Sequence, residues 1–169
     1  MIVKTNDRPK LDIPKGMFER LIDGAAIGAL VWIVFYLVSV WGILPEQIPA
    51  HFNGAGEVDR WGSRWELVML PVIAALLWVG MTFLEEHPEW HNYMTELNER
   101  NIEFQYWNSR MLLNVLKNLI VHAFVYLSYR TTQVALGEAD YLGVMFLPIF
   151  LVLIFAPMII FMIRSLRHR

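Results

Sequence analysis

A polar, glycine-containing stretch at residues 44–65 carries most of the residues in the first half of the chain that could do chemistry. His51, Glu57 and Asp59 combine an imidazole with two carboxylates, a donor set that suits zinc or acid–base work. His51 and Asp59 are the metal candidates, but no second histidine lies nearby. In the structural alternative, His51 bonds the loop backbone and Asp59 pairs with a neighbouring arginine. We assign no catalytic residue and expect no cofactor.

The same stretch contains a turn signal, the dipeptide Asn53-Gly54. The residues on either side, Ile48–Phe52 and Val58–Trp61, can pair as the two strands of a short hairpin. Such a hairpin would bring the imidazole of His51 close to the carboxylate of Asp59. We therefore predict an ordered recognition element between two apolar runs.

A second polar group interrupts a later apolar run. Asn114, Lys117, Asn118 and His122 are three or four positions apart, so they share one face of a helix. Burying them in hydrocarbon costs several kcal/mol unless they find partners or water. One interpretation is a polar seam for a ligand headgroup, an ion or a proton, with His122 as the proton-handling candidate. In the other, Lys117 reaches the cytoplasmic interface and the asparagines bond neighbouring helices.

His87 and His91 form a third candidate, because residues four apart share a helical face and can hold a metal. Pro88 lies between them, and a helix accommodates proline only in its first turn. The alternative is a solvated helix start whose acidic neighbours complement the helix dipole.

These groups are set in an unusually apolar chain. Of 169 residues, 56% are hydrophobic and 18% are charged, and the apolar ones gather in long runs. About 20 apolar residues cross about 30 Å of hydrocarbon as a helix. We predict an all-α integral membrane protein, a single membrane domain over residues 1–169, with four transmembrane helices at about residues 24–44, 66–84, 111–129 and 141–163.

Composition also excludes several kinds of site. The absence of cysteine excludes disulfides, zinc–thiolate sites and thiol nucleophiles. A net charge of −2 gives no reason to expect a nucleic-acid partner.

The polar segment 85–110 carries apolar side chains at roughly helical intervals, among them Trp90, Leu97 and Phe104. This pattern predicts an amphipathic helix on the cytoplasmic membrane surface, between the second and third spans. Residues 1–23 are predicted to form a cytoplasmic N-terminal segment.

The distribution of Lys and Arg predicts the orientation. Ten of these residues lie in the N-terminal segment, the second loop and the C-terminal segment, against three in the first and third loops. We therefore expect both termini in the cytoplasm of a bacterium, a multi-pass protein in its cytoplasmic membrane, and the 44–65 loop on the outer side.

The outer loop resembles the N-terminal membrane domain of SdpI-type immunity proteins, catalogued as domain of unknown function 1648. The resemblance covers roughly residues 27–80 and rests on a Pro-x-His-x-Asn core, a glycine and an Asp-Arg-Trp-Gly-Ser end. The loop residues that carry it, and that it implies shape a binding surface, are Pro49, His51, Asn53, Gly56, Asp59, Arg60, Trp61 and Gly62. The rest of the chain is similar to small relatives of the family through residues 106–117 and 146–148.

The family's named member protects its producer from a secreted toxin peptide and sequesters a cytoplasmic repressor at the membrane. The resemblance thus implies a non-enzymatic protein that senses, or confers immunity to, an extracytoplasmic peptide or other ligand. A second hypothesis is a small transporter or lipid-binding protein that uses the polar face of the third span and forms a homodimer. A third is a metal-dependent membrane hydrolase at His51. Expected partners are the lipid bilayer, a secreted toxin peptide or other outer ligand, and a cytoplasmic regulator.

Overall fold

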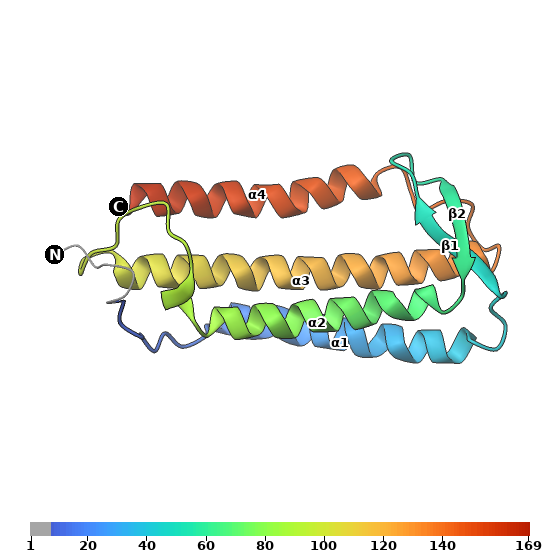
Figure 1. The fold of residues 1–169 in the computed structure, drawn as a ribbon, viewed down its shortest axis with the longest axis horizontal. Helices are drawn as coiled ribbons and strands as arrows, with labels where there is room; N and C mark the ends of the chain where they lie inside the picture. The colour runs from blue at the N-terminus through green and yellow to red at the C-terminus, as the bar shows by residue number, and fades with distance from the viewer. Residues whose placement is uncertain (1–7) are drawn as a thin grey trace.

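The computed structural model describes residues 8–169 as four long helices capped at one end by a small β-hairpin (Figure 1). The helices are α1 (Met17–Val40), α2 (Glu66–Glu85), α3 (Ile102–Ala135) and α4 (Phe146–Arg167). All four are long and apolar enough to cross a membrane. The backbone N–H and C=O groups of a helix hydrogen-bond one another, so a helix needs no hydrogen bonds from the hydrocarbon, which can form none. The prediction of four membrane-spanning helices is therefore confirmed.

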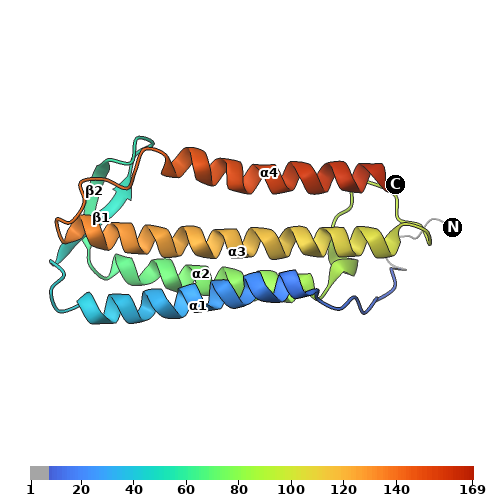
Figure 2. The same ribbon diagram turned by 180° about the vertical axis from the view of Figure 1, so that it is seen from behind.

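Helix α3 is the centre of the bundle. Helices α1 and α2 lie together on one side of it and α4 lies on the other, as the two opposite views agree (Figures 1 and 2). The main core lies between α1, α2 and α3, where Ala26 and Ala74 are fully buried. Such small side chains let helix backbones approach closely. Helix α4 buries little of its surface, so most of its apolar side chains remain free to face lipid.

The prediction of one amphipathic helix over residues 85–110 is wrong. The segment instead contains the short 3-10 helix η2 (Pro88–Trp90) and an irregular stretch, and α3 begins only at Ile102. Asn98 Oδ1 accepts the backbone N–H groups of Arg100 and Asn101, which holds a turn in place before α3. Leu97 and Tyr93 of this segment pack with Tyr106 and the N-terminal segment in a small second core, whereas Trp90 and Met94 are exposed.

The helix bounds also differ from the predicted spans. Helix α1 starts at Met17, inside the predicted N-terminal segment 1–23, whose first residues lie outside the described part of the chain. Helix α3 is 34 residues long and extends beyond the predicted span 111–129 at both ends. Its extension over residues 102–110 mixes polar and apolar side chains and lies within the helix predicted over 85–110, whereas the extension over residues 130–135 begins with polar side chains.

The predicted hairpin is present. Strand β1 (Gln47–Phe52) pairs antiparallel with β2 (Val58–Ser63), one residue longer at the start of the first strand and two at the end of the second than predicted. The register shifts twice, between Pro49 and His51 and again between His51 and Phe52. Such irregularities re-aim side chains, so simple strand alternation does not hold in the middle of this hairpin.

Candidate functional site

The turn of the hairpin is organised by Asn53. Its Oδ1 accepts the backbone N–H groups of Ala55 and Glu57 at 2.9 and 3.0 Å, and its Nδ2 donates to the Glu57 carboxylate at 3.0 Å. Asparagine suits this position because its short side chain reaches backbone groups nearby. Glu57 is thereby committed to the turn, which leaves it outside any acid–base pair with His51.

Gly56 fixes the turn against the loop before α4. Its φ of +82° lies in the left-handed region that glycine tolerates, and an added Cβ would lie 3.0 Å from Gly143 O. The Leu142 N–H also donates to Gly56 O at 2.8 Å. The tip of the hairpin therefore rests on the loop between α3 and α4.

The register shifts bring His51 and Asp59 together. His51 Nδ1 lies 2.6 Å from Asp59 Oδ1, and the two side chains are 64% and 43% exposed. The predicted proximity of these two residues is confirmed. Each remains accessible enough to meet a ligand.

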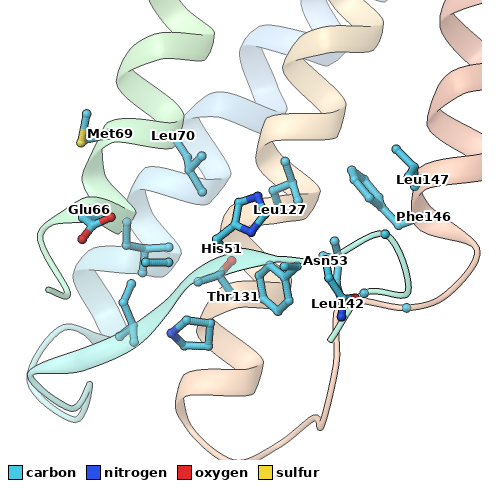
Figure 3. Close-up of a pocket in the computed structure, with 18 of the residues that line it drawn as sticks. His51, Asn53, Glu66, Met69, Leu70, Leu127, Thr131, Leu142, Phe146 and Leu147 are labelled. Carbon is cyan, nitrogen blue, oxygen red and sulfur yellow. The ribbon is translucent and has the colours of Figure 1, made fainter. Parts of the chain in front are cut away.

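Beneath the hairpin lies a cavity of about 590 Å³, the hairpin cavity (Figure 3). Its roof is strand β1, where the His51 ring points towards the helices and the buried Pro49 forms part of the wall. Its other walls come from α2, α3 and the start of α4, and they are mostly apolar: Leu67, Met69, Leu70, Ile73, Leu127, Phe146 and Leu147. The cavity thus combines an apolar interior with polar groups on one side.

Arg60 ties the hairpin to the start of α2. It donates to Glu66 at 2.8 Å and to Ala50 O at 3.0 Å, and the bond to Glu66 raises the pKa of Arg60. Gly62 permits this approach, because an added Cβ would lie 2.8 Å from the Ala50 Cβ. Trp61 is 56% exposed and is therefore accessible to an outside partner.

The second predicted site is a buried network at the opposite end, the polar core: Lys15, Asp23, Glu85, Asn114, Lys117 and Asn118. Lys117 Nζ lies 3.1 Å from Asp23 Oδ1 and 2.9 Å from Glu85 Oε1. It also donates to Thr82 and lies over the Trp78 ring. The Lys117 side chain is fully buried among these partners, so its ammonium is bonded within the bundle and does not reach solvent.

The asparagines complete this network. Asn114 and Asn118 donate to Asp23 Oδ1 at 2.9 and 2.8 Å, and Trp78 donates to the Asn118 amide oxygen. The prediction that these amides bond neighbouring helices is confirmed. Each amide links α3 to both α1 and α2, since Asn114 also donates to Glu85.

Lys15 closes the network from the segment before α1. Its ammonium lies 2.8 Å from Asp23 Oδ2 and 2.7 Å from Glu85 Oε2. Burial alone lowers the pKa of Lys15, but these two carboxylates outweigh it and raise the pKa above its usual value. Two ammonium groups thus neutralise two carboxylates inside the bundle.

Close by, Arg110 of α3 bonds the buried Glu19 of α1 at 3.2 Å. It also donates to the backbone oxygens of Ile13 and Pro14. The segment before α1 is therefore held down by two basic side chains, Lys15 and Arg110.

His122 does not join the polar core. Its Nδ1 contacts Asn118 O at 2.7 Å within the same helix, and its side chain is exposed. Helical spacing places the four predicted residues on a broad face, and the neighbouring helices cover only three of them. The prediction of one shared polar seam is wrong for His122.

His87 and His91 do not face each other across a helix turn. His87 bonds Glu89 and stacks on Trp90, whereas His91 contacts Ser109 Oγ at 2.6 Å and Leu84 O at 2.9 Å. Burial lowers the pKa of His91. Within residues 8–169, no three His, Asp or Glu side chains gather as a metal site.

Comparison with known proteins places this architecture in a family. Residues 26–75, which cover most of α1, the hairpin and half of α2, match the domain of unknown function DUF1648. An uncharacterised protein of the archaeon Archaeoglobus fulgidus is 33% identical over 148 residues, which are 79% of this chain and 78% of the relative. The chain belongs to the family of this archaeal protein. No solved structure matches it.

The DUF1648 match covers the hairpin and the α2 wall of its cavity, whereas Lys117 and Asn118 lie beyond it. The sequence pattern indicated the loop but missed Asp23 and Glu85, the acidic half of the polar core, and Glu19, the partner of Arg110. Their signal was a carboxylate at the edge of an apolar run, which by itself is typical of an ordinary membrane boundary.

Proposed function

We propose that this protein is a non-enzymatic membrane protein whose hairpin end binds an extracytoplasmic ligand with an apolar part. A secreted, membrane-active peptide is the ligand that we favour, and sensing it or giving immunity to it is the role. The observation that carries the proposal is the hairpin cavity, whose apolar walls lie beside the accessible His51–Asp59 pair. Pockets of this kind, mostly apolar with a few placed polar groups, are typical ligand sites.

The resemblance of the loop to SdpI-type immunity proteins supports the same proposal. The loop residues quoted for it build the cavity roof, the turn and its tie to α2. Such a protein would read the ligand outside, and a cytoplasmic regulator would meet the opposite end of the bundle.

The excess of Lys and Arg at the end opposite the hairpin supports an outward-facing hairpin in a prokaryotic cytoplasmic membrane. The chain has no cysteine, so Ala55→Cys in the exposed turn supplies a single thiol. A membrane-impermeant thiol reagent should label Ala55→Cys in intact cells and should leave Glu96→Cys unlabelled until the cells are opened. The reverse pattern would place the hairpin inside and refute the proposed role.

A transporter or lipid-binding function based on the polar core has less support. Its ammonium and carboxylate groups bond one another, which leaves few of them free to take a ligand. A hydrolase has less still, since Glu57 is bonded within the turn.

The main test is protection of a sensitive bacterial strain against a panel of secreted antimicrobial peptides. We expect the wild-type chain to protect against at least one peptide and the His51→Ala/Asp59→Ala variant to lose that protection at equal membrane levels. The matched control is Glu86→Ala, which removes an exposed carboxylate far from the hairpin. Protection that survives in the double variant, or no protection by any chain, would refute the proposal.

A further inference from the structure

A second cavity, which is polar and has a volume of about 720 Å³, lies at the end of the bundle opposite the hairpin. It is formed where α4 ends beside the start of α3, the region at the C label in Figure 1. The residues that line this basic cavity are Asn98, Glu99, Arg100, Asn101, Phe104, Arg167, His168 and Arg169.

In the part of the chain that the structure describes, the guanidinium groups around this cavity lack the carboxylate partners that the basic side chains inside the bundle have. Lys15, Lys117 and Arg110 each bond a carboxylate in the bundle interior. Within residues 8–169, no Asp or Glu carboxylate forms a salt bridge with the guanidinium of Arg100, Arg167 or Arg169. Glu99 is the acidic residue in the lining, so positive charge predominates there.

The surrounding structure holds this cluster in place. The Arg164 guanidinium lies 4.8 Å from the Trp107 ring and 5.1 Å from the Phe161 ring. Gln105, buried in α3, donates to the backbone oxygens of Ser165 and His168 at 2.9 and 3.0 Å. The basic end of α4 is thus fixed on α3 before any ligand arrives, which lowers the entropy cost of binding.

The position of the cluster indicates what it meets. Helix α4 carries no charged residue from Phe146 to Ile163, and Arg164 follows at once. When that apolar stretch crosses the hydrocarbon, the cavity lies at the level of the lipid headgroups. Basic pockets between membrane helices at this level bind anionic headgroups.

We propose that the basic cavity binds the phosphate of an anionic glycerophospholipid, with Arg100 and Arg167 as its main cationic contacts. This site is distinct from the hairpin cavity and does not depend on the function proposed for it.

The test is native mass spectrometry of the full chain in detergent, titrated with phosphatidylglycerol or with phosphatidylcholine of the same acyl chains. We expect the wild type to bind phosphatidylglycerol about tenfold more tightly, since each basic residue near the headgroups contributes roughly 1 kcal/mol. The Arg100→Gln/Arg167→Gln variant should lose this preference while its thermal unfolding in lipid-free detergent changes little.

The matched control, Lys10→Gln/Arg20→Gln, removes the same charge outside the cavity and should keep the preference. Equal affinity for the two lipids in the wild type, or an equal loss in the control, would overturn the proposal. So would glycerol phosphate that displaces the lipid at the lipid's own concentration, because the occupant would then be a soluble phosphate ester.

Discussion

The hairpin cavity and the polar core both gather charged and amide side chains, but these side chains face different surroundings. In the polar core, Lys117 and its partners are buried and bond one another across three helices. At the hairpin, the His51–Asp59 pair is exposed beside an apolar cavity. The difference separates stability from recognition, because groups that satisfy one another inside a bundle have little left for a ligand.

The comparison also explains why residue cost is a poor guide to function here. Lys117 lies in an apolar run, where a charged side chain has the highest free-energy cost of burial in hydrocarbon, yet its ammonium bonds two carboxylates in the structure. The histidine in the outer loop costs little and stays accessible.

The largest expected effect is on the polar core. Lys117→Met should lower the free energy of unfolding in detergent by about 3–5 kcal/mol, because it leaves buried carboxylates without their full complement of charge. Glu85→Gln in the same chain should restore part of the loss by removing the excess negative charge. Equal stability of Lys117→Met and the wild type would show that the polar core does not hold the helices together.

A smaller effect is expected at the hairpin turn. Gly56→Ala should destabilise the protein by roughly 1–3 kcal/mol, because alanine is strained at this positive φ and its Cβ would press on Gly143 O. The control Gly54→Ala should change little, since the nearest atom to its added Cβ is 4.0 Å away. Thermal unfolding of the two variants measures the difference, and equal losses would refute the special role of Gly56.

The pH dependence of stability tests the half-buried His91 near the polar core. Its Nε2–H donates to Leu84 O and its Nδ1 accepts from Ser109, so the neutral ring is satisfied. Because burial lowers its pKa in the folded state, the unfolded chain takes up the proton first as the pH falls. Stability should therefore decline as the pH drops below the ordinary value of 6.5 and level off below the lowered pKa.

Thermal unfolding measured between pH 8 and pH 4 for the wild type and for His91→Gln tests this effect. The slope below the ordinary histidine range should be smaller in the variant. Superimposable slopes would show that His91 does not contribute.

The smallest expected effect on stability is at the candidate ligand site. His51→Ala/Asp59→Ala should change the free energy of unfolding by no more than about 1 kcal/mol, because exposed ion pairs contribute little. The same variant should lose peptide protection completely. A loss of several kcal/mol, measured in detergent, would make this pair a structural element and remove the contrast with the polar core.

Much of the hairpin end was predictable from local signals. The Asn53-Gly54 turn and the strands beside it lie next to each other in sequence, so their pairing needs no distant partner. The cavity beneath them was not predictable, because its walls come from α2, α3 and α4, which are far apart along the chain.

The opposite end was predicted less well. Periodicity suggested a helix over residues 85–110, but the small core of Leu97, Ile102 and Tyr106 with the N-terminal segment decided its conformation. Helical spacing likewise put His122 with Lys117, while the placement of α1 and α2 decided which of them would be buried.

The sequence by itself determined that the chain forms membrane-crossing helices with a structured polar loop. Runs of apolar residues must satisfy their backbone groups internally in hydrocarbon, and a turn dipeptide acts over a few residues. Only the tertiary structure decided which polar groups bond one another inside the bundle and which stay accessible to a ligand. Asp23, Glu85 and Lys117 neutralise one another because three helices bring them within bonding distance, and no pattern within one helix specifies that meeting.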